Sequence, residues 1–379
     1  MKILTVVGTR PEAIKMAPVI AEARRRGLAV RVCATAQHRE LLDQVLGLFA
    51  IVPDRDLDLM RPAQTLADFA ARALAAVDRV LAVERPDWVL VQGDTTTAMV
   101  AALAAFYRSV PVGHVEAGLR TGDLARPFPE EMNRRTIDML SRAHFAPTLG
   151  AGSNLLREGI AASSIHVTGN TVVDALLEAR AMPCPDSELA AAAMPPLAPN
   201  ERLVLVTAHR RESFGDGMRA IARAVARLAA AVPDVRIVYP VHPNPNVREP
   251  MEEILAGTPR VHLISPLPYL AFVHLMSRAH LIVSDSGGVQ EEAPTLGVPA
   301  LVLRETTERP EAIEAGAVRL VGVDEEAIVR AALEVLGEPA VRDAMARAIN
   351  PYGDGQAAAR IVRILLGEPW TPFASEGRG

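Results

Sequence analysis

The chain has 379 residues, of which 50% are hydrophobic and only 4% aromatic, and its formal net charge is −5 at pH 7. This length favours two domains, and an alanine-rich apolar fraction suits helices over a buried sheet rather than an all-β fold. The slightly acidic balance excludes a global field that would attract nucleic acid or an anionic membrane.

The cysteines and the apolar runs exclude further classes of protein. Cys33 and Cys184 are too few for a disulfide framework or a cysteine-based zinc site. The apolar run after Met1 is interrupted by Arg10, which makes it too short for a signal peptide. The chain contains no run of about eighteen uncharged apolar residues, which is the length that a membrane-spanning helix needs. We therefore expect a cytoplasmic protein with no metal and no membrane partner.

The first half of the chain alternates strand and helix patterns. The expected strands are Ile3–Val7, Ala29–Ala34, Trp88–Gln92, Val110–Val115 and His144–Ala146. The expected helices between them are Ala13–Arg26, Glu40–Leu48, Leu66–Glu84, Thr96–Tyr107 and Glu130–Ser141. This β-α order predicts a parallel, doubly wound sheet.

The second half repeats this order after a proline-rich stretch at residues 181–200, which is typical of a linker. Its expected helices include Gly217–Ala231, and its expected strands are Leu203–Thr207, Arg236–Pro240, His262–Ser265, Leu281–Ser284, Ala300–Leu303 and Val318–Gly322. We therefore predict two Rossmann-like α/β domains, residues 1–180 and residues 201–355. The functional site is expected in the cleft between them.

The segment Gly8–Pro18 joins the first strand directly to a charged turn. Open parallel sheets bind ligands outside the carboxyl ends of their strands, and here that position offers Arg10 and Lys15 as cations for a phosphate. No Gly-x-Gly-x-x-Gly pattern follows the strand, so the segment does not predict a dinucleotide site.

Three acids and a histidine also fall at or just beyond predicted strand ends. Asp94 closes the third strand, Glu116 follows the fourth, and Glu130 lies in the first turn of a helix. His209 ends the first strand of the second half. Carboxylates and imidazole are the groups that general acid–base chemistry uses, so these residues are candidate catalytic groups.

The segment Ser284–Glu292 predicts a phosphate cradle. A strand runs through Ser286 into Gly287 and Gly288 and then into a helix, whose free N–H groups and positive dipole end suit an anion. No Gly-Lys-Ser/Thr follows, so this is not a Walker loop. Glu292, one turn on, could bind ribose hydroxyls, and Arg309 adds a cation beyond the next strand.

Together these segments resemble the non-hydrolysing UDP-N-acetylglucosamine 2-epimerases, and the resemblance covers nearly the whole chain. The motifs that carry it are Gly8–Pro18, Gln92–Thr95, His114–Arg120, Pro127–Arg134, Val167–Thr171, His209–Glu212, Ser284–Glu292 and Thr307–Glu311. The resemblance implies a glycosyltransferase-B-like pair of domains, with a C-terminal helix at about 356–379 packing back on the first. It also implies a homodimer and no cofactor.

The resemblance further implies roles by matching position. The residues expected to hold the diphosphate are Arg10, Ser286, Gly287, Gly288 and His209. Glu292 should hold the ribose, with Phe272 and Arg309 lining the nucleotide site. The residues expected around the sugar are Lys15, Asp94, Glu116 and Glu130, while His209 assists UDP departure. Which carboxylate removes the C2 proton stays open.

The implied reaction inverts C2 of UDP-N-acetylglucosamine (UDP-GlcNAc) to give UDP-N-acetylmannosamine (UDP-ManNAc). Because no credible dinucleotide site exists for a redox route, elimination of UDP to a 2-acetamidoglucal and re-addition is favoured. The alternatives are a hydrolysing 2-epimerase that releases ManNAc, a glycosyltransferase of the same fold, and a non-catalytic nucleotide-sugar sensor.

Two substitutions predict weak or absent activation by UDP-GlcNAc. Family members activated by their own substrate usually carry Gln-His followed closely by Gln, and an Arg just before Gln-Thr-Leu. This chain keeps Gln37-His38 but has Glu40 and Ala63 at the other positions. The negative charge of Glu40 would repel a second diphosphate, and Ala63 removes the arginine that would hold a phosphate. We expect hyperbolic kinetics on pure UDP-ManNAc without a lag. A strict requirement for added UDP-GlcNAc would contradict this.

Overall fold

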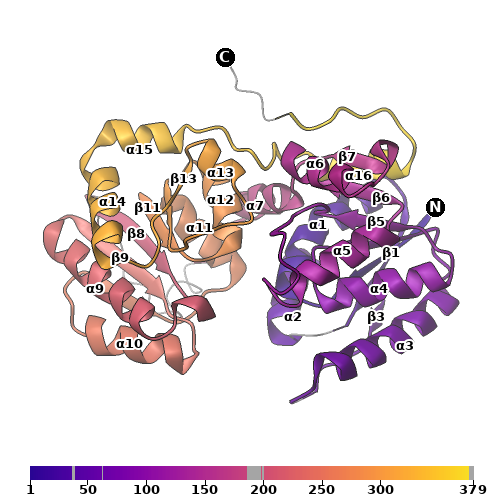
Figure 1. The fold of residues 1–379 in the computed structure, drawn as a ribbon, viewed down its shortest axis with the longest axis horizontal. Coiled ribbons are helices and arrows are strands. Elements are labelled where there is room, and N and C mark those ends of the chain that lie inside the picture. The colour runs from indigo at the N-terminus through magenta and orange to yellow at the C-terminus, as the bar shows by residue number, and fades with distance from the viewer. Residues whose placement is uncertain (36–38, 62, 186–197, 199, 375–379) are drawn as a thin grey trace. The chain divides into compact units, whose positions relative to one another are not determined.

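The computed structural model describes residues 1–35, 39–61, 63–185, 198 and 200–374. The chain forms two compact units, an N unit of residues 1–175 and 352–374 and a C unit of residues 176–351 (Figure 1). The division falls inside one helix, α7 (Thr171–Ala181), rather than at the predicted residues 181–200. Most of that predicted linker lies outside the described residues.

The N unit is built on a seven-stranded parallel sheet of order β3-β2-β1-β4-β5-β6-β7. Its strands are β1 (Lys2–Val7), β2 (Ala29–Ala34), β3 (Arg55–Asp56), β4 (Trp88–Gln92), β5 (Val112–Val115), β6 (Ala143–Ala146) and β7 (Ile165–Val167). All five predicted strands are confirmed. The sequence did not predict β3 and β7, because these short edge strands are exposed or half-buried and carry little apolar signal.

The helices of the N unit largely follow the prediction. They are α1 (Arg10–Arg25), α2 (Arg39–Leu48), α3 (Leu66–Glu84), α4 (Thr96–Tyr107), α5 (Glu130–Leu140), α6 (Leu149–Arg157), part of α7, and α16 (Ala357–Leu365). Helix α1 begins at Arg10, earlier than the predicted Ala13. The reason is a cap: Glu12 accepts hydrogen bonds from the backbone N–H groups of Gly8 and Thr9, at 3.0 and 2.7 Å.

The C unit repeats this plan with a six-stranded parallel sheet of order β10-β9-β8-β11-β12-β13. Its strands are β8 (Arg202–Thr207), β9 (Val235–Pro240), β10 (Val261–Ile264), β11 (Leu281–Ser284), β12 (Ala300–Val302) and β13 (Val318–Leu320). Its helices include α9 (Asp216–Ala231), α10 (Pro245–Leu255), α11 (Tyr269–Arg278), α12 (Gly287–Leu296), α13 (Glu311–Glu314), α14 (Glu325–Gly337) and α15 (Pro339–Ala346). All six predicted strands of this half are confirmed.

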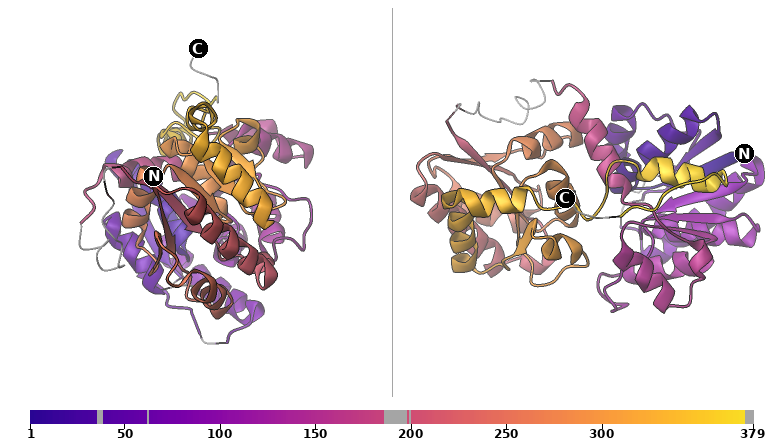
Figure 2. Two further views of the ribbon diagram at one scale, coloured as in Figure 1. Left: turned by 90° about the vertical axis from the view of Figure 1, so that its left-hand side faces the viewer. Right: turned by 90° about the horizontal axis from the view of Figure 1, so that it is seen from above.

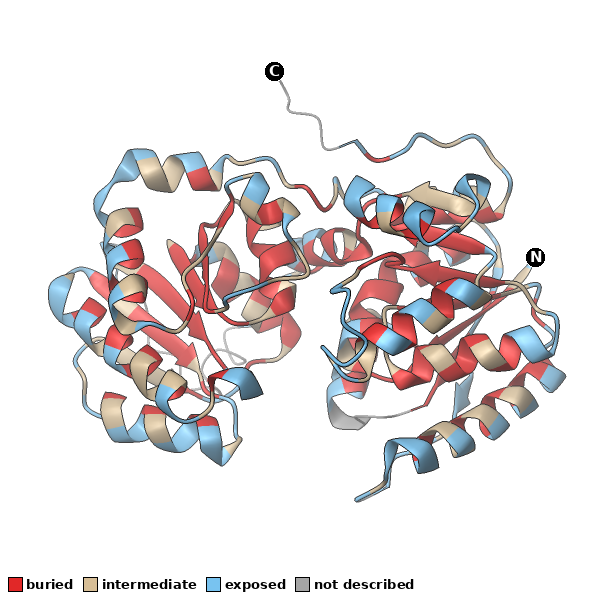
Figure 3. Cartoon of the chain, in the orientation of Figure 1, coloured by how far each residue is buried: buried red, intermediate tan, exposed pale blue. Residues whose placement is uncertain are grey.

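The central strands of both sheets are buried, and helices supply the apolar side chains that cover them (Figure 3). In β1 and β8 five of the six residues are buried. Strands buried on both faces read as continuous apolar runs, and this is why the sequence located them well. Within the described residues, none of the helices combines the length and apolarity that a membrane crossing requires.

The C-terminal segment returns to the N unit, where α16 packs against α1 (Figure 2). The N-cap residue of α16 makes no side-chain cap. Instead Asp174 of α7 accepts hydrogen bonds from the backbone N–H groups of Ala357 and Ala358, at 3.2 and 2.9 Å. An Arg26–Glu368 ion pair holds the chain beyond the helix. A carboxylate from another helix therefore caps α16 and fixes it in place.

The Asp174 cap predicts a pH-dependent stability. Burial raises the pKa of its carboxyl to about 6, and the two backbone hydrogen bonds offset this only in part. Since this folded pKa lies above the ordinary value, the folded state binds the proton more tightly, and stability falls as pH rises from about 4 to about 6. Over that range the wild type should lose on the order of 2 kcal/mol relative to Asp174→Asn. Urea unfolding of both proteins at several pH values measures this, and parallel profiles would contradict it.

Candidate functional site

The strand order of each sheet reverses beside its first strand. In the N unit the reversal lies between β1 and β4, and in the C unit between β8 and β11. Open α/β sheets bind ligands at the carboxyl ends of the strands at such a switch point. Arg10 and Asp94 follow the two N-unit strands there, while His209 and Ser286 follow the two C-unit strands. We call the group Lys15, Asp94, Glu116 and Glu130 the acid site, and the group His209, Ser286, Gly287, Gly288 and Arg309 the anion site.

Glu116 of the acid site is held by a buried ion pair. The Nζ of Lys15 donates to both carboxylate oxygens at 2.7 Å, and the two side chains are 11% and 4% exposed. The side-chain amide of Gln92 donates to the same carboxylate. Glu116 also has a φ of +69°, a backbone conformation that residues other than glycine rarely adopt. Lys15, predicted as a cation for phosphate or sugar, here neutralises Glu116.

Asp94 is fixed by two consecutive residues of α5. Arg134, whose side chain is 6% exposed, donates to the Asp94 carboxylate, and the Asn133 amide donates to the Asp94 carbonyl at 2.9 Å. We did not assign roles to Asn133 and Arg134 from the sequence. Their spacing carried a signal, because residues three and four positions after Glu130 share its helix face.

Glu130 differs from the other two acids. It is the first residue of α5, directly after the N-cap Pro129, and it is half-buried. Its Oε2 is buried and has no hydrogen-bond partner among the described residues. A buried carboxylate oxygen without a partner is costly, so Glu130 is the acid-site carboxylate whose capacity for a hydrogen bond or proton is unused.

A carboxylate that the sequence did not single out ties the β1 and β4 turns together. Glu12 holds the N–H groups before α1 and accepts a hydrogen bond from Thr95 Oγ1 at 2.7 Å, directly beside Asp94. Burial raises the pKa of Glu12 to about 7 despite these hydrogen bonds. Arg10 begins α1 in this capped turn and is half-buried.

The anion site is built on the start of α12. Ser286 is the N-cap and makes no side-chain cap hydrogen bond within the described residues, so the positive end of the helix dipole is left for another group. A Cβ at Gly287 would lie 3.0 Å from Nη1 of Arg309 and 3.4 Å from Nη2 of Arg210. Glycine thus allows two guanidinium groups to lie against the start of the helix.

Acidic neighbours hold these guanidinium groups in place. Nε of Arg309 donates to Oε1 of the buried Glu291 at 2.7 Å, and Nη1 donates to Glu308. Burial alone would raise the pKa of Glu308, but Arg309 and Arg304 outweigh it and the pKa falls to about 2. Burial and the nearby Arg304 lower the pKa of Arg210. Arg210 is a cation of this cluster to which we assigned no role from the sequence.

Asp285 positions the turn that carries His209. This fully buried aspartate precedes Ser286, and its Oδ2 accepts hydrogen bonds from the backbone N–H groups of His209 and Arg210, both at 2.7 Å. The His209 side chain remains exposed, with its ring centroid 5.6 Å from that of His242. The β8 and β11 turns are therefore tied together by one carboxylate.

The two remaining predicted residues lie on neighbouring helices of the C unit. Glu292 is buried in α12, and a Cβ at Gly288 would lie 3.8 Å from its Oε2. Phe272 is half-buried in the first turn of α11, which packs against α12. Of these two residues, Glu292 is the one that a short distance, to Gly288, places beside the anion site.

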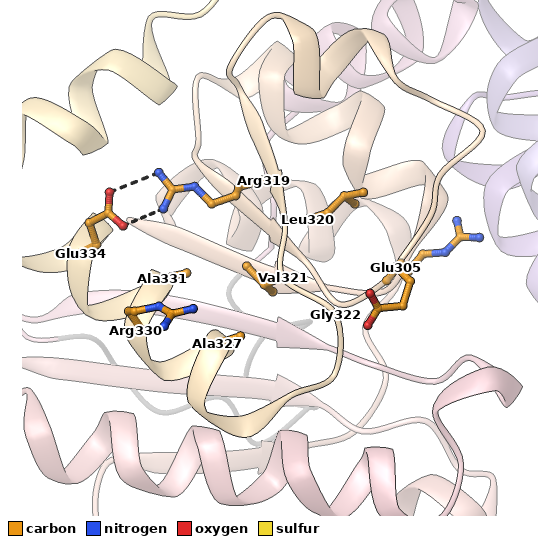
Figure 4. Close-up of a pocket in the computed structure, with 10 residues that line it drawn as sticks. Glu305, Arg319, Leu320, Val321, Gly322, Ala327, Arg330, Ala331 and Glu334 are labelled. Atoms are coloured by element: carbon orange, nitrogen blue, oxygen red, sulfur yellow. Dashed lines mark hydrogen bonds and ion pairs between the residues drawn. The ribbon is translucent and has the colours of Figure 1, made fainter.

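A separate cavity of about 340 Å³ lies in the C unit at the end of β13 and beside α14 (Figure 4). An Arg319–Glu334 ion pair crosses one side of it. Arg304 belongs to its lining, but no residue that we predicted for the site does. In the described part of the chain, no three His, Cys, Asp or Glu side chains gather as a metal ion would require.

Two parallel, doubly wound units, one with acids at its switch point and one with an anion cradle, define an α/β protein of the glycosyltransferase-B-like type. The glycotransferase of kitacinnamycin shares this fold, with a TM-score of 0.65 at 15% identity over 97% of this chain and 98% of that chain. Likeness at that identity shows the fold alone.

Closer relatives identify the family. The family described as UDP-N-acetylglucosamine 2-epimerase matches residues 21–366. The UDP-N-acetylglucosamine 2-epimerase of Escherichia coli (strain K12) is 55% identical over 369 residues, 96% of this chain and 98% of that protein. The crystal structure of the Neisseria meningitidis UDP-GlcNAc 2-epimerase bound to UDP-GlcNAc has a TM-score of 0.91 and 49% identity, covering 97% and 100%. The chain belongs to the UDP-N-acetylglucosamine 2-epimerase family.

The Lys15–Glu116 pair predicts a strong energetic coupling. Removing one partner leaves the other as an uncompensated buried charge, which costs about 3–5 kcal/mol. We expect Lys15→Met to lower the free energy of unfolding by that amount. The double variant Lys15→Met/Glu116→Gln should be less destabilised, by about 1–3 kcal/mol, than the sum of the losses in Lys15→Met and Glu116→Gln. Urea unfolding of the four proteins measures the coupling. If the effects of the two single substitutions simply add, the pair contributes no coupling energy.

Proposed function

We propose that the chain interconverts UDP-GlcNAc and UDP-ManNAc by eliminating UDP and adding it back, as a non-hydrolysing 2-epimerase. Relatives named as UDP-N-acetylglucosamine 2-epimerases cover almost the whole chain, and one of them is bound to UDP-GlcNAc. The observation that carries the proposal is the acid site. Asp94 and Glu116 follow the neighbouring strands β4 and β5 and are engaged by Arg134 and Lys15, and Glu130 begins α5, the helix that carries Arg134.

The chemistry explains why both sets of residues are needed. The C2–H bond of the sugar is not adjacent to a carbonyl, so simple deprotonation is unfavourable. In the proposed step a base takes the C2 proton, the C1–C2 double bond forms, and UDP leaves with the electrons of the C1–O bond. Return of a proton to the other face of C2 and re-addition of UDP at C1 complete the inversion.

The anion site supports the departure of UDP. The uncapped start of α12 and the guanidinium of Arg309 are fixed before the reaction, so they stabilise the charge that develops on the diphosphate at little reorganisation cost. We assign to His209 assistance of that departure, and to Arg10 a further contact with the diphosphate. Glu292 holds the ribose, and Phe272 lines the nucleotide site.

The acid site supplies the proton transfers. Lys15 and Arg134 stabilise Glu116 and Asp94 as carboxylates, whereas Glu130 has an unpartnered, buried Oε2. We assign to Glu130 the removal of the C2 proton, because its free oxygen is the one open to a new hydrogen. Asp94 and Glu116 bind the sugar, and one of them takes up a proton from solvent and passes it to the other face of C2, while the proton on Glu130 is lost to solvent.

Proton NMR of UDP-GlcNAc in D2O tests the function, using EDTA-treated protein and no nicotinamide. UDP-ManNAc signals should grow while deuterium enters at C2. Release of free ManNAc with UDP would assign the chain to hydrolysing 2-epimerases. An unchanged spectrum with measurable UDP binding would favour a glycosyltransferase or a nucleotide-sugar sensor.

In the same experiment Glu130→Gln should slow deuterium entry by about 10²–10⁴-fold, the usual contribution of a positioned general base. UDP affinity should stay within about twofold, since the diphosphate contacts lie elsewhere. The matched control is Asp123→Asn, an exposed carboxylate seven residues earlier, which should behave as wild type. Normal exchange in Glu130→Gln would reassign the base to Asp94 or Glu116.

A further inference from the structure

A fully buried histidine, His114, lies beneath the acid site in the N unit. It is on β5, two residues before Glu116, and it is 0% exposed. The family resemblance gave this residue no role. Because burying a polar ring is costly unless both nitrogens find partners, its contacts show what holds it there.

Both ring nitrogens of His114 face hydrogen-bond acceptors. Nδ1 lies 2.6 Å from Oδ1 of Asp138, and Nε2 lies 2.8 Å from the carbonyl oxygen of Gly93. A carbonyl oxygen can only accept. Arg120 donates to the other oxygen of Asp138, Oδ2, at 2.7 Å, and this ion pair favours an ionised Asp138, so Oδ1 also accepts. Both contacts are satisfied together only when both nitrogens carry hydrogen, that is, as an imidazolium.

One carboxylate, Asp138, contacts the ring directly, and ion pairs continue from it. Arg120 donates to Oδ2 of Asp138 at 2.7 Å and pairs with Glu158 at the end of α6, also at 2.7 Å. Arg135 lies 3.5 Å from the same Glu158. His144 on the adjacent strand contacts the Asp138 backbone carbonyl at 2.8 Å. With a positive His114, the buried Asp138 shares its charge between two cations.

The contact with Gly93 links this network to the acid site. Gly93 directly precedes Asp94 and has a φ of +68°, and its N–H donates to the carbonyl of Val115, the residue before Glu116. On the other side, α5 holds Asp94 through Asn133 and Arg134. His114, which lies on the strand that leads to Glu116, therefore holds the main chain of Gly93 and with it the position of Asp94.

We propose that His114 is a positioning residue that, as a doubly protonated ring, holds the Gly93–Asp94 turn in register with Glu116. It acts through these residues and does not touch the substrate. The proposal rests on the proposed function for its kinetic consequences. A displacement of a reacting group of about 1 Å costs on the order of 10²-fold in rate, so loss of this clamp should reduce turnover.

Two substitutions separate the two contacts of the ring. An asparagine amide nitrogen reaches about as far as Nδ1 and can keep the Asp138 contact, whereas a glutamine amide nitrogen reaches as far as Nε2 and can keep the Gly93 contact. We expect His114→Asn to lower kcat by at least about tenfold and His114→Gln to lower it less. UDP affinity should be unchanged in both, because the anion site is in the C unit.

The matched control is His166→Gln. His166 lies on β7 of the same sheet and is half-buried, and its ring packs against Phe145 and Trp370. Its kcat should stay within about threefold of wild type. A folded His114→Asn variant with wild-type kcat, or equal losses in His114→Asn, His114→Gln and His166→Gln, would overturn the positioning role.

The protonation state is tested without any activity. In wild-type protein labelled with ¹³C and ¹⁵N, the His114 ring resonances, assigned by through-bond correlation from its own backbone, should show two protonated ring nitrogens. One protonated and one bare nitrogen would overturn the imidazolium, even if the variants do not fold. An inactive wild type with two protonated nitrogens would instead count against the proposed function and leave this clamp supported.

Discussion

The reversal of strand order beside β1 and β8 is the constraint on which the other features of this protein depend. Connections on either side of the reversal turn to opposite faces of the sheet, so the carboxyl ends of the two strands between them are not covered by a crossing helix. In each unit those ends carry residues of the predicted site. The N unit places Arg10 and Asp94 there, and the C unit places His209 and the start of a helix.

Buried charges around these edges are compensated locally. Lys15 is paired with Glu116, Arg134 with Asp94, and Arg120 with Asp138, each within the N unit. Since an uncompensated buried charge is far more costly than a paired one, such pairs fix the geometry of the carboxylates. Among the groups that the described residues leave without a hydrogen-bond partner or a side-chain cap are Oε2 of Glu130 and the start of α12, and both belong to the predicted site.

Several acids in this chain serve the backbone instead of a substrate. Glu12, Asp174 and Asp285 each accept hydrogen bonds from two main-chain N–H groups. Each also joins segments that are distant in the sequence, Glu12 through its contact with Thr95. Their pattern of contacts separates them from Glu130. Asp285 also has a buried oxygen, Oδ1, without a hydrogen-bond partner among the described residues, but its Oδ2 holds two backbone N–H groups. Glu130 accepts no backbone N–H among the described residues, so its carboxylate has no such structural task and is available for proton transfer.

The sequence by itself determined the two parallel sheets and the strand-end positions of the acids, because strands buried on both faces leave continuous apolar runs and glycine marks where they end. Motif spacing also located Ser286–Gly288 before a helix. The sequence could not show that Lys15 pairs with Glu116, that Asp285 holds the His209 turn, or that both nitrogens of His114 are engaged. Those contacts join residues 21 to 101 positions apart. Only the tertiary structure decides them, since side-chain pairing depends on which strands become neighbours, and local pattern carries no record of that.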